Sequence, residues 1–139
     1  MNAKRFLKML RDMEDEISEK TAELEIIDSR LKKVTATLSL CPSKASGNND
    51  LIGSLVAKKV ELDTRINDLW LDFFEYEKKV LAVLEQVRAE KSIYYKILYK
   101  HYVAYISLAD ITKEEQYSYK YIVEMHGKAL KCVEKILNN

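Results

Sequence analysis

The apolar spacing of two long stretches, residues 3–40 and 51–88, constrains the fold most. In both stretches apolar residues follow one another at alternating steps of three and four. This spacing has a period near 3.5 residues and is typical of a left-handed coiled coil. A short polar segment, residues 41–50, joins the stretches, so the two helices are expected to fold back antiparallel. The sequence therefore predicts a long antiparallel coiled-coil hairpin.

The residues that form this seam also predict a register. In the first stretch they are Phe6, Leu10, Met13, Ile17, Leu24, Ile27, Leu31, Val34 and Leu38. In the second they are Ile52, Leu55, Leu62, Ile66, Leu69, Phe73, Tyr76, Val80, Val83 and Val87. A turn centred near Gly47 places Phe6 opposite Val87. In the same register the lysine Lys59 faces Val34 and lays its stem on the seam.

Composition agrees with an all-α protein. The chain of 139 residues has one proline and three glycines, and 32% of its residues are charged. No apolar run is long enough to span a membrane. Residues 1–8 are polar and do not resemble a signal peptide, so a cytoplasmic location is expected. The two cysteines, Cys41 and Cys132, lack zinc-ligand spacing and are expected to be reduced thiols.

The second stretch carries a further apolar stripe beside its seam. Its members are Val56, Val60, Trp70, Phe74, Leu81 and Leu84. A helix with so broad an apolar surface is covered on two sides. The first helix covers one side, and the C-terminal segment, a second protomer or both cover the other. We expect a homodimer joined through Val56, Val60, Trp70, Phe74 and Leu81.

The C-terminal third predicts a small helix-turn-helix bundle. The first expected helix spans 92–103 and either begins at Ser92 or continues the second helix. After a turn at 104–107, a short helix over 108–115 is expected, with Ser107 as its cap. A second turn at 116–117 leads to a helix over 119–137 that is capped by Ser118. A short helix, a tight turn and a longer capped helix form a helix-turn-helix pattern. The chain is thus divided into a dimerising arm, 1–91, and a helix-turn-helix-like domain, 92–139.

Several motifs resemble an uncharacterised family from phages and prophages of Gram-positive bacteria. The matching segments are Met1–Lys4, Thr35–Ser39, Ile97–Val103, where the family has "vLxxRYi", Tyr117–Ile122, where it has "GYSxRxV", and Met125–Leu130, where it has "LHGRAL". Members of this family combine a coiled-coil arm with a helix-turn-helix similar to region four of bacterial sigma factors. The resemblance implies a transcriptional regulator that binds promoter DNA, RNA polymerase or both in the bacterial host cell.

The chain departs from this family at positions that matter for DNA reading. Gln116 stands where the family has its turn glycine, and Glu115 stands where the family has a core leucine. Thr112 takes the place of a small alanine. Three family arginines are lysines here: Lys100, Lys120 and Lys128. Arginine is favoured for bidentate reading of guanine. The alternative is therefore a protein-binding adaptor or phage-encoded inhibitor whose degenerate helix-turn-helix no longer reads DNA. A purely structural coiled-coil spacer would leave the capped C-terminal helices unexplained.

If duplex DNA is bound, the start of the final helix is expected to enter the major groove. The expected DNA-binding residues are Ser118, Tyr119, Lys120, Val123, Glu124, Lys128 and Lys131. The competing interpretation is a solvated polar face. Eight of the nine tyrosines lie between Tyr94 and Tyr121, and they form either a core or a protein-binding surface that includes Tyr95, Tyr99 and Tyr105.

The remaining residues with chemical potential predict no enzyme. The resemblance assigns both histidines, His101 and His126, to packing of the helix-turn-helix, and no carboxylate or cysteine stands at metal-ligand spacing from either. Gly127, inside the final helix, is expected to allow close helix packing. No phosphate-binding loop or nucleophile arrangement is present, so we expect no catalytic residue, metal or cofactor.

Overall fold

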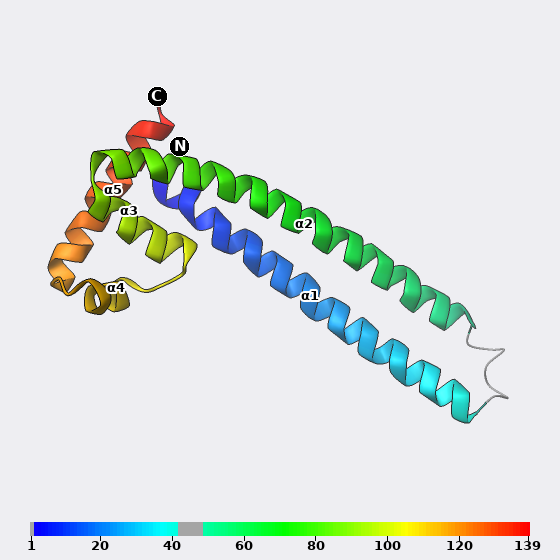
Figure 1. Cartoon of the computed structure of the whole chain (residues 1–139). Coiled ribbons are helices and arrows are strands. Elements are labelled where there is room, and N and C mark those ends of the chain that lie inside the picture. Colours follow the sequence, from blue (N-terminus) through cyan, green and yellow to red (C-terminus); the bar gives the residue numbers. More distant parts are fainter. Residues whose placement is uncertain (1, 42–48) are drawn as a thin grey trace. The chain divides into compact units, whose positions relative to one another are not determined.

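The computed structural model describes residues 2–41 and 49–139, and these residues are almost entirely helical. In chain order the elements are α1 (Ala3–Leu40), α2 (Asn49–Glu90), α3 (Ser92–Leu98), the π-helix η2 (Tyr99–Val103), α4 (Leu108–Glu115) and α5 (Tyr119–Leu137) (Figure 1). No strand occurs among the described residues. The predicted all-α class is confirmed.

The chain divides into two compact units. The first contains residues 1–14 and 73–139, and the second contains residues 15–72. Both long helices therefore contribute to both units. The domain boundary predicted at residues 91 and 92 coincides with the break between α2 and α3, inside the first unit.

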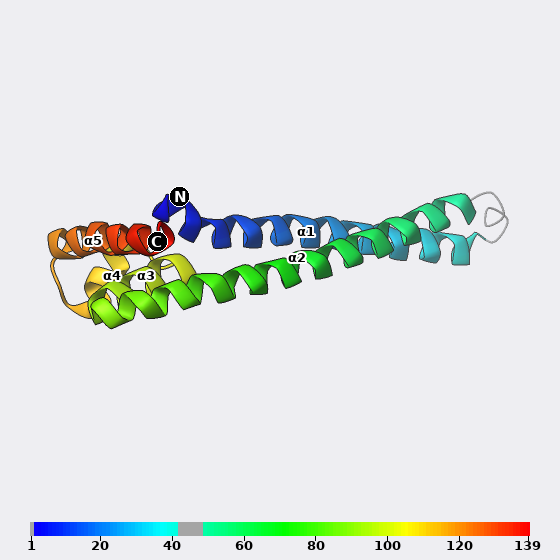
Figure 2. The ribbon, with the colours of Figure 1, turned by 90° about the horizontal axis from the view of Figure 1, so that it is seen from above.

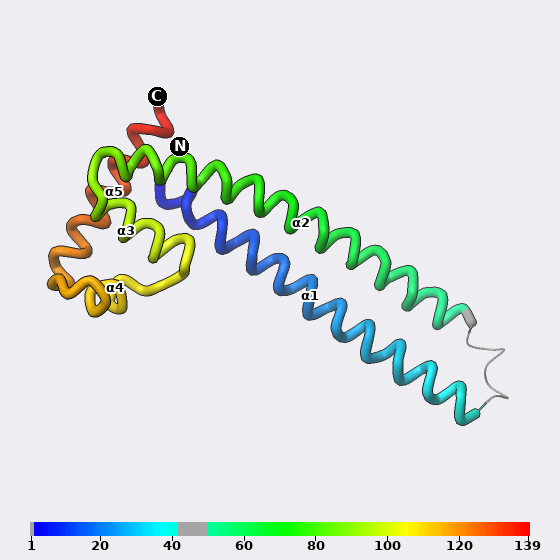
Figure 3. Tube along the Cα trace, in the orientation of Figure 1, coloured from blue at the N-terminus to red at the C-terminus, as the bar shows by residue number. Residues whose placement is uncertain are grey.

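In the second unit, α1 and α2 lie side by side and antiparallel (Figures 2 and 3). Two ion pairs join the helices. Lys59 Nζ lies 2.8 Å from Asp28 Oδ1, and Arg65 lies 3.4 Å from Glu16. These side chains are largely exposed, so each pair contributes little net stability. Most of the stabilisation therefore comes from the seam, whose predicted residues in both helices are all buried or half-buried.

The predicted register of the two helices is wrong. Lys59 pairs with Asp28 rather than facing Val34. In the first unit, the Phe6 ring lies 5.5 Å from the Tyr76 ring, and the Tyr76 hydroxyl donates a hydrogen bond to the Phe6 carbonyl. Phe6 was expected opposite Val87. An aliphatic seam accepts slips along its repeat because apolar residues still meet apolar residues, so polar and aromatic contacts select the register. Gly47, the expected centre of the turn, lies outside the described residues.

The first unit is built around the C-terminal helices. Both α3 and α4 pack against α5. The side chains at the centre are completely buried: Leu84, Val87, Ile97, Leu98, Ile111, Ile122, Ala129 and Val133. They come from α2, α3, α4 and α5, and Leu7 of α1 and Val80 of α2 are equally buried in this unit, so α1 to α5 all contribute to its buried cluster.

The structure resolves whether the second helix continues into the third. Lys91 is extended, with φ −152° and ψ 129°, and separates α2 from α3. Ser92 is the first residue of α3 and does not act as its cap. The helical segment spans residues 92–103, as expected. Its final five residues form the π-helix η2, where the Ala104 amide donates a hydrogen bond of 3.0 Å to the Tyr99 carbonyl.

Helix caps define α4 and α5. The Ser107 hydroxyl accepts from the Asp110 amide and the Ser118 hydroxyl from the Tyr121 amide, each at 3.1 Å. Both helices have the predicted limits. Gln116 ends α4 in the left-handed conformation, with φ 59°, a region that favours glycine. The turn between α4 and α5 is thus present, and glutamine occupies the position where a positive φ would favour glycine.

The buried cluster predicts a large difference between two leucines of α2. Leu84 is completely buried, whereas Leu71 is 64% exposed. We expect Leu84→Ala to lower the free energy of unfolding by about 2–5 kcal/mol because it opens a cavity. The matched variant Leu71→Ala should cost less than about 0.5 kcal/mol. Denaturant unfolding followed by circular dichroism measures both, and equal losses would contradict the assigned core.

Candidate nucleic-acid interface on α5

The helix α5 has one apolar and one polar face. Its apolar face is buried and consists of Ile122, Met125, Ala129, Cys132 and Val133. Tyr119 and Val123 lie on the opposite side and are 57% and 40% exposed. The hydrophobic spacing of α5 therefore determines which of its residues face outward.

All seven predicted DNA-binding residues are exposed. They are Ser118, Tyr119, Lys120, Val123, Glu124, Lys128 and Lys131. At 100° per residue, the six residues within α5 occupy one half of the helix surface. This arrangement, hereafter called the α5 face, brings together side chains that could contact bases and side chains that could contact phosphates.

The α5 face is weakly basic. The helix contains four lysines and two glutamates, a net charge of 4 − 2 = +2. Lys128 and Glu124 form an exposed ion pair at 3.5 Å. Within the described part of the chain, Lys120 and Lys131 form no ion pair. These two lysines are therefore the cations best able to meet an external anion.

Lys100 is engaged inside the first unit. Its ammonium lies 3.0 Å from Glu114 and 2.7 Å from Glu115. These contacts raise the pKa of Lys100, and the hydrogen bond from Lys100 lowers the pKa of Glu115. This cluster was not predicted from the sequence, although the opposite charges of Lys100 and Glu115 are compatible with a pair. The cluster ties α4 to η2.

Two of the predicted interface tyrosines form an aromatic stack near the surface. The rings of Tyr95 and Tyr99 lie 5.7 Å apart, and the Arg88 guanidinium lies 3.8 Å from the centre of the Tyr95 ring. Tyr99 is 38% exposed. This stack presents aromatic edges that suit a protein contact.

Tyr105, the third predicted interface tyrosine, makes contacts within the first unit. It has a left-handed backbone, with φ 59°. Its ring lies 5.4 Å from the Arg11 guanidinium. Burial and a hydrogen bond with Glu14 raise the pKa of its hydroxyl. Tyr105 therefore holds the segment after η2 against the start of α1.

The predicted stripe on α2 is only partly covered. Leu84 is completely buried, and Trp70 and Leu81 are half-buried. Val56, Val60 and Phe74 are 42%, 59% and 56% exposed. One end of the stripe is thus buried, whereas most of the expected protomer contacts remain on the surface.

The two histidines and Tyr102 form a packed cluster. His101 Nδ1 lies 2.7 Å from the Ile106 carbonyl, and the Tyr102 hydroxyl lies 2.8 Å from His126 Nε2. The histidine rings are 5.5 Å apart. Burial, with the charges of His101 and Lys4, lowers the pKa of His126 to about 4. No group of three potential metal ligands occurs among the described residues.

Gly127 corrects one expectation. A Cβ atom added there would meet no atom of another described helix or loop within 4 Å. The predicted close helix packing at Gly127 is therefore absent within the described chain. The residue lies instead on the exposed side of α5.

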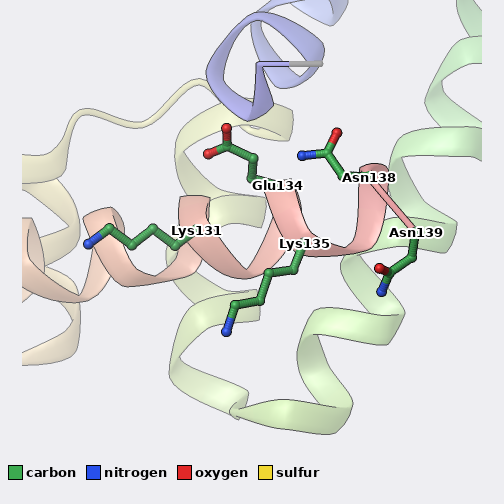
Figure 4. Close-up of a pocket in the computed structure, with 5 residues that line it drawn as sticks. All are labelled: Lys131, Glu134, Lys135, Asn138 and Asn139. Carbon is green, nitrogen blue, oxygen red and sulfur yellow. The ribbon is translucent and has the colours of Figure 1, made fainter.

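One depression in the surface has no convergent ligand set among the residues that line it. It encloses about 510 Å³ at the end of α5 and is lined by Lys131, Glu134, Lys135, Asn138 and Asn139. These side chains point in different directions (Figure 4). A small-molecule site normally has a few polar groups directed at one point, which this depression lacks.

Comparison with known proteins identifies no relative. No protein-family model, curated protein or solved structure matches the chain. Across the helices that the structure describes, none is long and apolar enough to cross a membrane.

The His126 environment predicts loss of stability in mild acid. In the unfolded chain His126 takes up a proton near its usual pKa of 6.5, whereas in the folded chain it does so only near 4. Protonation therefore favours the unfolded state as the pH falls through this window. The melting temperature should fall as the pH is lowered from about 6.5 to about 4, and His126→Gln should flatten this dependence. An equally steep fall in the variant, measured by circular dichroism, would exclude His126 as its cause.

Proposed function

We propose that this chain is a phage or prophage transcriptional regulator that binds promoter DNA, RNA polymerase or both through α4 and α5. The observation that carries the proposal is the α5 face, on which all the predicted contact residues are exposed together. The sequence resemblance to a sigma-region-four-like helix-turn-helix supports the same function.

In the proposed complex, the first turns of α5 enter the major groove. Lys120 donates hydrogen bonds to a base edge or phosphate, and Glu124 accepts from a cytosine amino group. Val123 contacts a thymine methyl group, and Tyr119 packs beside it. Ser118, Lys128 and Lys131 meet flanking phosphates, which set the orientation of the helix. The Lys100 cluster holds α4 in position to support α5.

A protein-binding adaptor or phage-encoded inhibitor is the second candidate. Specific observations favour it: Tyr117, Tyr119 and Val123 are 47%, 57% and 40% exposed, and Lys100 is held by two glutamates. Exposed aromatic residues are enriched in protein interfaces. In this alternative, α5 and the tyrosine stack contact a host protein inside the bacterial cell.

A second copy of the chain is also part of the proposal. Val56 and Val60 lie one turn apart on α2 and are both largely exposed. Apolar residues repeated on one helix face can be buried against the same face of a second copy, in an interface with two-fold symmetry. A dimer would carry two α5 faces.

Substitution of Lys120 tests the DNA-binding function. In a titration with random-sequence duplex DNA, Lys120→Ala should weaken binding and reduce the slope of log K against log salt by about one. The control Lys78→Ala removes an exposed lysine of α2 and should leave the slope unchanged. Identical slopes for wild type and Lys120→Ala would remove Lys120 from the site.

A capture experiment distinguishes the two candidate functions. The adaptor function predicts no duplex binding at low salt, together with recovery of a host protein such as RNA polymerase by the immobilised chain. Tyr119→Ser should then reduce recovery because it removes the exposed ring from the α5 face. The adaptor function would be contradicted if the wild-type chain binds duplex DNA in a salt-dependent way and Tyr119→Ser recovers as much host protein as wild type.

Light scattering tests the dimer. At micromolar concentration the mass should be twice the chain mass of 16.2 kDa. Val60→Lys should shift it toward the monomer because it places a charge in the apolar contact. A wild-type mass of one chain would contradict the expected dimer.

A further inference from the structure

Gly127 occupies the middle of the α5 face. It is the ninth residue of the 19-residue helix. Val123 lies one turn before it and Lys131 one turn after it, on the same side. Gly127 is therefore surrounded by residues that the proposed function assigns to DNA contacts.

The chain itself gives no reason for glycine at this position. Glycine destabilises the interior of a helix relative to alanine. No described glycine has a positive φ, so the backbone does not require one here. A Cβ atom would meet nothing within 4 Å, so packing within the chain does not require one either. The absent side chain leaves the main chain of α5 open to an external molecule.

Gly53 provides a comparison within the same protein. It also lies in a helix, is exposed and has no atom within 4 Å of an added Cβ. Gly53 is close to the first residue of α2, Asn49, where a helix end frays readily. Gly127 is instead in the centre of α5, where the cost to helix formation is greatest.

We propose that Gly127 lets the sugar-phosphate backbone of duplex DNA approach the main chain of α5. This inference rests on the proposed DNA-binding function. Charge selects the partner, because Lys120 and Lys131 flank the glycine on the exposed side and form no ion pair among the described residues. Glu124 and Lys128, which also border it, are charged, so Val123 is the one apolar member of the α5 face beside Gly127 and an apolar helix packed there would bury charged side chains.

Substitutions at the two glycines test this inference. Gly127→Ala and Gly127→Leu add side chains of increasing size, and Gly53→Ala and Gly53→Leu are the matched controls. Both alanine variants should raise the melting temperature by a few degrees because alanine favours the helix. Binding to random-sequence duplex DNA should weaken several-fold for Gly127→Ala and about tenfold or more for Gly127→Leu. The salt slope should remain that of wild type, since no cation is removed.

The outcomes separate this inference from the proposed function. If wild type binds DNA and Gly127→Leu binds it with the same affinity, the close approach at Gly127 is overturned but the proposed function is not. Absence of wild-type DNA binding at low salt would overturn both, including the case in which α5 captures only a host protein. Equal weakening by the Gly53 variants would also overturn the inference, because the effect would then not be specific to the α5 face.

Discussion

Burial of the apolar side of α5 is the constraint on which the rest of the candidate site depends. Ile122, Ala129 and Val133 are completely inaccessible to solvent. Removing these side chains from water fixes the rotation of α5 about its own axis. Since a helix has only one opposite side, Tyr119 and Val123 must then face outward. The α5 face is therefore a direct consequence of core packing.

Polar contacts complete what apolar burial leaves undetermined. The Ser118 hydroxyl defines where α5 begins, and the Lys100 cluster joins η2 to the end of α4. The Glu115 side chain is only 18% exposed, so its carboxylate would be poorly solvated without the ammonium of Lys100. The ion pair therefore compensates for placing a charged residue at the end of α4.

The sequence was most informative where structure is local. Helix caps act over three residues and the seam repeats within one helix, so the limits of α4 and α5 and the buried seam of the two long helices followed from the sequence. The register did not, because pairing Phe6 with Tyr76 depends on residues 70 positions apart. The Lys100–Glu115 contact was missed for the same reason. Gly127 was misjudged because glycine indicates a close approach without indicating whether the approaching group belongs to the same chain.

The charge of the α5 face limits how the proposed regulator could bind DNA. Three lysines, Lys120, Lys128 and Lys131, correspond to about three released counterions per helix, whereas firm DNA binding typically uses about 6–10 phosphate contacts. Lys128 is also partly neutralised by Glu124. A single α5 face would therefore bind DNA weakly at physiological salt. Firm binding requires a second α5 face or a protein that is already on the DNA, because linked contacts make the second binding event intramolecular. The weak charge thus explains why dimerisation and contact with RNA polymerase belong to the same proposal as DNA binding.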